Sequence, residues 1–488
     1  MKTFILFMML IDYINGSPYS FGEFQRHTTT DSYASSKSDT NIFAILTGLC
    51  EETEDNISLN LSYTGLQRIH EKFINNSHIT CLNLSNNNII YVSPTAFELL
   101  PNLTYLNLAN NRVSVPAFRL SVKNSKLKTL VLDNNHFGDQ NSIFNFHDTF
   151  SNIEHLYLRQ NSLNSFSNTN IFLNLRHLYL SDNIISSVDK IIGEIPRSTL
   201  TYLYLERNSI RHVNGTTLYN LEYLALDGNR IESLCNQYCH NSWLSLNRMT
   251  KLKHLSLSGN QITEIESDSF LETSNLITLD LSNNRITTIR KDTLKPLTML
   301  EVLSLSGNRL TTFPEFFPLI NIQNFTLVNN NLASIPTELF SDFRVLKYLS
   351  LSNNYISNVE KRAFLNLISL EELDLSNNRI ENLPEEWMTP QNRIRNLNLE
   401  DNYFTDFKNL SLENAESLEN IFLQRNAIEV LNVASFLNVS EYVSIHIEDQ
   451  SKRRLSNTKK DGSSSDSTTF SYEYATSNIN YRYDDYYN

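Results

Sequence analysis

The chain has few of the residues that mark most enzyme classes. Only 11 of its 488 residues are glycine, and no glycine-rich phosphate-binding loop occurs. No motif pairs a nucleophile with a base. Basic residues number 40 against 53 acidic ones, and no basic block has the size of a nucleic-acid footprint. We therefore expect a protein that is not an enzyme, uses no cofactor and binds no nucleic acid.

Long hydrophobic runs are also missing. Residues 1–16 are predicted to be an export signal, because Lys2 precedes an apolar stretch and Gly16 stands at a plausible cleavage point. That stretch is too short to span a bilayer, and no later one is long enough. The last residues carry no hydrophobic tail for a lipid anchor. We predict a secreted, extracellular protein with no membrane span.

The chain has only four cysteines, which suit disulfide bonds in that compartment. Four cysteines allow three connectivities, and the simplest joins Cys50 to Cys81 and Cys235 to Cys239. A metal site that adds His240 to the second pair is the alternative. Two cysteines and one histidine are an incomplete ligand set, so we favour disulfides and predict no metal.

What the chain does have is one asparagine that returns at a regular interval. Each stands in the frame L-x-x-L-x-L-x-x-N-x-L, and eight of the fourteen intervals are 24 residues long. A fixed period in this range indicates a solenoid of stacked turns. The series is Asn87, Asn111, Asn135, Asn161, Asn183, Asn208, Asn229, Asn260, Asn284, Asn308, Asn330, Asn354, Asn378, Asn402 and Asn426.

The frame also predicts how each turn is built. The leucines of L-x-L alternate on a short strand and point into the core, so parallel strands stack into one sheet. The asparagine follows, where its amide can bond backbone groups that the strand leaves unpaired. The rest of the turn returns on the outer side, with a buried phenylalanine such as Phe97, Phe270 or Phe364. The outer side is longer than the strand spacing, so the sheet lies on the concave face.

The repeat divides the chain into segments. Residues 17–49 are a Ser/Thr-rich leader that we expect to be disordered. Residues 50–76 form an N-terminal cap with a degenerate repeat, in which Thr64 takes the asparagine position. The solenoid occupies 77–450 and ends on a decayed repeat with Gln450 in that position. Residues 451–488 are a basic, then tyrosine- and acid-rich tail, again expected to be disordered.

This pattern resembles the extracellular, typical class of leucine-rich repeat proteins over roughly residues 57–450. Units such as Leu281-Ser-Asn-Asn284-Arg-Ile286 look like those of insect Toll-type and chaoptin-like ectodomains and of secreted mosquito immune factors. The resemblance implies an α/β solenoid: a right-handed horseshoe of about 16–17 repeats, with a parallel concave sheet and an irregular or short-helical convex side. It also implies a protein-binding scaffold. A cysteine-rich C-terminal cap, a membrane span and a signalling domain are missing from the pattern.

Function is expected on the concave sheet, where the third, fifth and seventh positions of the frame face outward. In five consecutive repeats these positions are rich in rings and charges, a composition enriched at binding hot spots. The predicted binding patch is His155, Tyr157, Arg159, His177, Tyr179, Tyr202, Tyr204, Glu206, Tyr223, Asp227 and His254.

Three alternatives accompany this prediction. Aromatic residues favour strands, so the rings can stack for stability alone. His155 and His177 could reach one metal ion, but no carboxylate shares their column, so we favour no metal. The irregular intervals from 21 to 31 residues in this region either raise loops over the patch edge or reflect neutral drift on the outer side.

Several Asn-x-Ser/Thr sites follow the signal. Asn83 and Asn324 would point from the inner sheet, where a glycan would block binding. The remaining sites are glycosylation candidates, namely Asn56, Asn60, Asn75, Asn102, Asn214, Asn409 and Asn438. In the tail, tyrosines beside acids resemble sulfation sites, with candidates Tyr483, Tyr486 and Tyr487.

Two function classes follow. The leading hypothesis is a secreted scaffold that binds an extracellular protein or glycoconjugate through the concave patch, in innate immunity or host interaction. The alternative is a structural component of extracellular matrix or cell adhesion. The C-terminal end of the stack has no cysteine-rich cap, so a homodimer through that end is also expected.

Overall fold

The computed structural model describes eight stretches of the chain, all within the compact unit Glu52–Asp466. They are residues 56–114, 126–138, 151–164, 172–192, 199–236, 242–314, 319–428 and 443–447. The predicted leader and tail, with Tyr483, Tyr486 and Tyr487, lie outside the described residues, as do Cys50, Cys239 and Asn438. Those predictions stay untested.

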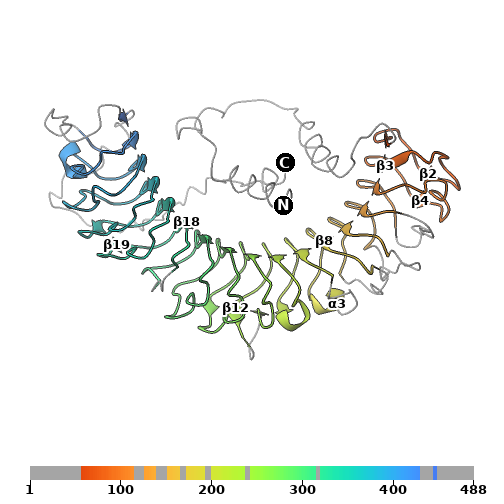
Figure 1. The fold of residues 1–488 in the computed structure, drawn as a ribbon, viewed down its shortest axis with the longest axis horizontal. Helices are drawn as coiled ribbons and strands as arrows, with labels where there is room; N and C mark the ends of the chain where they lie inside the picture. The colour runs from red at the N-terminus through yellow and green to blue at the C-terminus, as the bar shows by residue number, and fades with distance from the viewer. Residues whose placement is uncertain are drawn as a thin grey trace, which may run out of the picture. The chain divides into compact units, whose positions relative to one another are not determined.

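One continuous sheet of 17 parallel strands lines the inner side of the stacked turns (Figure 1). Each strand pairs with the corresponding strand of the next turn. The 17 strands agree with the predicted 16–17 repeats, and the solenoid prediction is confirmed. In chain order they are β1 (Ile57–Asn60), β3 (Ile79–Asn83), β5 (Tyr105–Asn107), β6 (Thr129–Val131), β7 (His155–Tyr157), β8 (His177–Tyr179), β9 (Tyr202–Tyr204), β11 (Tyr223–Ala225), β14 (His254–Ser256), β16 (Thr278–Asp280), β17 (Val302–Ser304), β18 (Asn324–Thr326), β20 (Tyr348–Ser350), β22 (Glu372–Asp374), β23 (Asn396–Asn398), β24 (Asn420–Phe422) and β25 (Ser444–His446).

The core lies between this sheet and the outer side of the turns. The two leucines of each L-x-L unit are buried, as in Leu349 and Leu351 of one turn. The prediction of buried phenylalanines on the outer side is confirmed for Phe97, Phe270 and Phe364. Each turn touches only its neighbours, so this apolar column is continuous along the stack.

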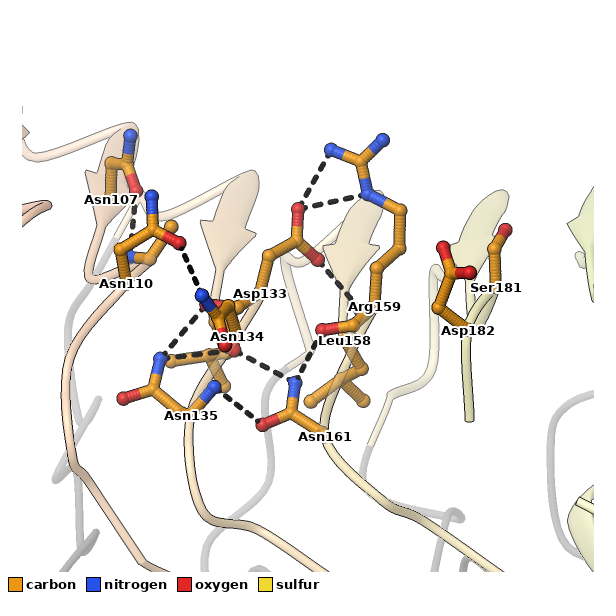
Figure 2. A network of polar contacts seen from close by, with 12 residues as sticks. Asn107, Asn110, Asp133, Asn134, Asn135, Leu158, Arg159, Asn161, Ser181 and Asp182 are labelled. Carbon is orange, nitrogen blue, oxygen red and sulfur yellow. Dashed lines mark hydrogen bonds and ion pairs between the residues drawn. The ribbon is translucent and has the colours of Figure 1, made fainter. Parts of the chain in front are cut away.

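The regular asparagines form the expected ladder. Asn378 is typical: its Nδ2 donates to the carbonyl oxygens of Leu351 in the preceding turn and Leu375 in its own, both at 3.0 Å. Its Oδ1 accepts from the backbone N–H of Ile356, also at 3.0 Å. One buried amide thus joins two turns where neither strand can pair its own backbone. Figure 2 shows a variant of this arrangement, in which the Oδ1 of Asn161 accepts from the backbone N–H of Asn135 in the preceding turn at 3.0 Å.

The residue before each ladder asparagine adopts a left-handed backbone. Asparagine or glycine stands there in most turns, because both adopt positive φ readily. Arginine takes the position twice, at Arg207 and Arg425, and each arginine pairs with an aspartate one turn earlier. In the first turns this column makes a second, exposed ladder, since Asn134 donates to Asn110 at 2.9 Å (Figure 2).

The outer side is only partly as predicted. Short helices occur at α3 (Asp189–Ile192), η3 (Gly215–Thr217) and η4 (Phe407–Leu410). Short parallel strands also form there, which the sequence did not predict. They are β2 (Arg68–Ile69) with β4 (Tyr91–Val92), β19 (Ser334–Ile335) with β21 (Asn358–Val359), and a four-stranded sheet in the order β10 (His212–Asn214), β13 (Trp243–Ser245), β12 (Ser233–Cys235) and β15 (Glu264–Ile265).

The longest interval, 31 residues from Asn229 to Asn260, explains that four-stranded sheet. It contributes two outer strands, β12 and β13, and β13 lies between β10 and β12. The described additional length of the interval therefore forms outer strands, while β14 of the same interval takes its regular place in the concave sheet. An extra outer strand between two turns widens that side by about 5 Å.

The first and last turns keep the frame in weakened form. Strand β1 pairs with β3, and the Thr64 hydroxyl reaches Asn87 Oδ1 at 3.1 Å, in the place of a ladder asparagine. Strand β25 pairs with β24 and ends the described sheet. Cys81 and Cys235 are each disulfide-bonded. The pairing with Cys50 and Cys239 and a homodimer through the C-terminal end both stay predictions.

Candidate functional site

The structure brings the predicted rings together on the concave sheet. We call them the aromatic belt: two columns that run across strands β7, β8, β9, β11 and β14. The register pairs His155 with His177 and Tyr157 with Tyr179, and it continues without a shift through the later strands. The belt consists of His155, Tyr157, His177, Tyr179, Tyr202, Tyr204, Tyr223 and His254.

Neighbouring rings stack face to face. The ring centroids of Tyr157 and Tyr179 lie 4.0 Å apart, and those of Tyr179 and Tyr204 lie 4.4 Å apart. In the other column His155 and His177 lie 4.3 Å apart, and His177 and Tyr202 lie 4.2 Å apart. Strand spacing of about 4.8 Å sets this distance, since parallel register places identical positions directly above one another.

The two columns meet at Tyr223. Its ring lies 4.8 Å from Tyr204 and 6.2 Å from Tyr202, and it is followed by His254 at 6.1 Å. The two columns merge because the small residue Ala225 occupies the fifth position of that turn, which leaves room for the ring of Tyr223 to lean toward the inner column. On the strand after β14 the columns carry Thr278 and Asp280, so the belt ends there. Near the C-terminal end of the sheet Phe422 and His446 form a separate stacked pair, with ring centroids 4.6 Å apart.

The tyrosines of the inner column are deeply placed. Tyr157 is only 9 % exposed, and its ring packs against that of Tyr179, which packs in turn against Tyr204. Burial raises the pKa of all three hydroxyls, so they remain protonated at any physiological pH. A binding partner would therefore meet ring edges and neutral hydroxyls, since the ring faces are already covered by neighbouring rings.

The histidines of the outer column are neutral. Burial lowers the pKa of His155, lowers that of His177 to about 3 and lowers that of His254 to about 4. The Nδ1 atoms of His155 and His177 are buried without a hydrogen-bond partner. Among the residues that the structure describes, no group of three or more His, Cys, Asp or Glu side chains is placed to hold a metal ion.

Arg159 lies beside the inner column at the first turn of the belt. Its Nε and Nη2 donate to Asp133 Oδ2 at 2.9 and 2.8 Å, while its backbone N–H donates to Asp133 Oδ1 (Figure 2). The guanidinium also lies 5.7 Å from the ring centre of Tyr157. Burial lowers the pKa of Arg159, but the Asp133 carboxylate outweighs it and holds the arginine charged.

Two carboxylates stand in the same column as Arg159, in later turns. Glu206 and Asp227 occupy the seventh position of adjacent turns, and both are more than nine-tenths buried. Ser181 Oγ donates to Glu206 at 2.5 Å, and Ser256 Oγ donates to Asp227 at 2.5 Å. Burial, with Asp280 and Glu206 nearby, raises the pKa of Asp227 to about 7. Along one side of the belt, the seventh-position column thus carries a fixed positive charge at Arg159 and two poorly solvated acids farther along, at Glu206 and Asp227.

Reasoning from the sequence missed four residues beside the patch. Tyr105 extends the outer column to β5 and is 3 % exposed; Asp133 orients Arg159; Ser181 and Ser256 hold the two acids. Each lies in one of the three outward columns of its turn, so a reading of the columns from β5 onward would have found them. Tyr348, in the third position of β20, is an isolated ring outside the belt.

The glycosylation candidates lie in different settings. Asn60 and Asn75 are exposed, although Asn60 belongs to the inner strand β1. The side chains of two half-buried candidates already make hydrogen bonds: Asn102 donates to the Ser77 carbonyl, and Asn214 Oδ1 accepts from Thr216. Asn56 and Asn409 are half-buried. Asn83 and Asn324 lie on inner strands as predicted, and Asn83 is buried.

Comparison with known proteins supports the repeat architecture. A family model described as "Leucine rich repeat" matches residues 58–113, 250–310 and 320–387. A protein phosphatase 1 regulatory inhibitor subunit PPP1R7 homolog from Arabidopsis thaliana is 31% identical over 167 residues. That match covers 34% of this chain and 47% of the relative. The chain therefore spans about half of the length of the relative.

Solved structures with a similar fold cover a larger share of the chain. A leucine-rich repeat protein from Leptospira interrogans has a TM-score of 0.56 at 25% identity and covers 73% of this chain and 93% of its own. Toll from Drosophila, in its complex with Spatzle, has a TM-score of 0.61 at 18% identity and covers 84% and 56%. At that identity Toll shares the fold alone. In the described part of the chain, no helix is long and apolar enough to cross a membrane. The chain is a leucine-rich repeat solenoid with a parallel sheet on its inner side.

Proposed function

We propose that this protein is a secreted recognition scaffold that binds another extracellular protein or a glycoconjugate through the aromatic belt. Innate immunity or host interaction is the proposed setting. The observation that carries the proposal is that two ring columns run side by side through β7, β8 and β9 and continue with one ring per strand in β11 and β14. Elsewhere on the described inner strands rings stand in one column at a time, at Tyr105, Tyr348 and the stacked pair Phe422 and His446. The match to a phosphatase regulatory subunit supports a protein partner in general.

The chemistry of the belt fits such a partner. Tyrosines present apolar edges with a polar tip and lose little entropy on binding, because stacking already fixes their rotamers. Arg159 and the two acids in the seventh-position column can fix the orientation of a ligand. Small glycoconjugates and protein side chains both bind to such combinations of ring edges and hydroxyls, and the belt accommodates several contacts at once.

Stacking limits which substitutions can test this proposal. Serine in place of Tyr157, Tyr179 or Tyr204 would open a cavity between rings and reduce stability by about 3 kcal/mol or more. Loss of binding would then be indistinguishable from unfolding. Tyr202 lies less deeply than those three residues, so its ring can be removed with less damage to the stack.

We expect Tyr202→Ala to weaken partner binding at least about tenfold, as truncation of a hot-spot ring does. The tagged full chain is used to capture partners from fluid of the source tissue, and the affinity of the captured partner is measured for each variant. Tyr219→Ala is the control, since Tyr219 is a 39% exposed tyrosine outside the belt. Equal affinities of wild type and Tyr202→Ala for every captured partner would contradict the belt proposal.

Secretion is tested separately. Expressed in animal cells, the full chain should appear in the medium and lose mass on treatment with an N-glycosidase. Asn75→Gln should remove one part of that mass, because Asn75 is exposed and stands in an Asn-Asn-Ser site. Retention of an unglycosylated chain inside the cells would argue against an extracellular role while leaving the concave surface untouched.

A further inference from the structure

A second surface runs along the flank of the solenoid, at the position directly after each ladder asparagine. The backbone N–H of this residue donates to a carbonyl of the preceding turn, as Arg285 does to Ile262 and Arg309 to Ile286, both at 2.9 Å. These bonds hold the side chains in single file with the spacing of the turns, about 4.8 Å. We name this row the arginine column; in successive turns it carries Arg230, Gln261, Arg285, Arg309, Asn331, Tyr355, Arg379 and Tyr403.

The column is positive in a chain that is acidic as a whole. None of the fifteen residues that follow a ladder asparagine is acidic, although the net charge of the chain is −13. The side chains of Arg230, Arg285 and Arg309 are exposed, and within the described residues they form no ion pair. Arg290, by contrast, pairs with Glu264.

The exposed positions on both sides of the central arginines are uncharged. Two residues before the column stand Asn283 and Gly307, and two residues after it stand Thr287 and Thr311. Farther along, the guanidinium of Arg379 lies 4.5 Å from the ring centre of Tyr355. No carboxylate stands two residues before or after Arg285 or Arg309, whereas Glu232 and Glu381 stand two residues after Arg230 and Arg379. The amide of Asn283 and the hydroxyls of Thr287 and Thr311 beside the central pair can serve as additional hydrogen-bond partners.

We propose that the arginine column binds a linear sulfated polysaccharide. Arginine forms paired hydrogen bonds with oxyanions, and the step between turns is similar to the length of one sugar ring in an extended chain. Hydroxyls and amides beside the arginines can bond the sugar hydroxyls. Nucleic acid fits less well, because the column offers two rings, one of them covered by Arg379, and no protruding element to enter a groove.

Immobilised heparin is the probe, with the full-length protein as analyte. Arg285→Gln/Arg309→Gln should weaken binding about tenfold and reduce its dependence on salt. The control is Arg344→Gln/Arg393→Gln, which removes the same charge from exposed arginines that precede strands β20 and β23 and lie outside the column. Lysine at positions 285 and 309 keeps the charge and should retain most of the affinity, which separates loss of charge from damage to the fold.

Three results would overturn the proposal: no loss in the glutamine variant, an equal loss in the control variant, or competition by single-stranded DNA as effective as that by heparin of equal charge. The surface is separate from the aromatic belt, so Tyr202→Ala should bind heparin as wild type does. Failure here therefore says nothing against the proposed function of the belt, and failure of the belt leaves this inference standing.

Discussion

Asn378→Ala should lower the free energy of unfolding of the surrounding turns by about 3 to 5 kcal/mol. The side chain is 2 % exposed and satisfies the carbonyl oxygens of Leu351 and Leu375 and the N–H of Ile356. Alanine leaves these buried groups without partners, and each unpaired group costs about 1 to 3 kcal/mol. Denaturant titration measures the loss, and hydrogen exchange should locate it in two adjacent turns.

The control is Asn331→Ala, at an exposed asparagine beside the ladder two turns earlier. It should change stability by less than about 0.5 kcal/mol, as surface substitutions usually do. If the two substitutions cost the same, the ladder amides would contribute no more than solvated ones, and the explanation of the asparagine period given above would be wrong.

Asp227→Asn should stabilise the protein at pH 8 by about 2 to 4 kcal/mol and leave it nearly unchanged at pH 4. The folded pKa of Asp227 is about 7, above the ordinary 3.8. Because the pKa is raised, the folded state binds more protons than the unfolded state at pH values between 3.8 and about 7. The stabilisation that Asp227 contributes to the folded state is therefore fully present below pH 3.8 and is lost as the pH rises through 7. Asparagine removes the cost of ionisation and can still accept from Ser256 and Ser258.

Thermal unfolding at the two pH values measures this difference. His177 and His254 act in the opposite direction, because their pKa values are lowered and their stabilisation is lost as pH falls below 6.5. They are present in both proteins and cancel in the comparison. Asp342→Asn, at an exposed carboxylate, should show no pH-dependent gain. An equal gain for Asp227→Asn at pH 4 and pH 8 would show that burial of charge is not its source.

Much of the fold can be predicted from the sequence because each turn repeats the same local rule. The L-x-L alternation and the asparagine after it determine strand, core and ladder together, and parallel register then aligns the columns. The gathering of Tyr157, Tyr179 and Tyr204 follows from that register alone. Thr64 shows how far the rule extends, since it takes the asparagine position of the degenerate first turn.

What could not be predicted depends on contacts between turns outside the frame. The outer strand β13 lies beside β10 of the preceding turn, and no local pattern indicates such a pairing. The depth of the belt rings also depends on their neighbours: each ring covers the face of the next, so residues counted as exposed by alternation are largely buried. The ring columns therefore stabilise the sheet and leave edges and hydroxyls for recognition.

The belt proposal is tested most directly by placing a photo-crosslinking phenylalanine derivative at position 202 in the full chain. Position 219, on another exposed surface, carries the same derivative in a second protein. Irradiation in fluid of the source tissue should give a specific covalent product from position 202, and addition of unlabelled wild-type protein should abolish it. Products from position 219 alone, or equal products from both positions, would contradict recognition through the aromatic belt.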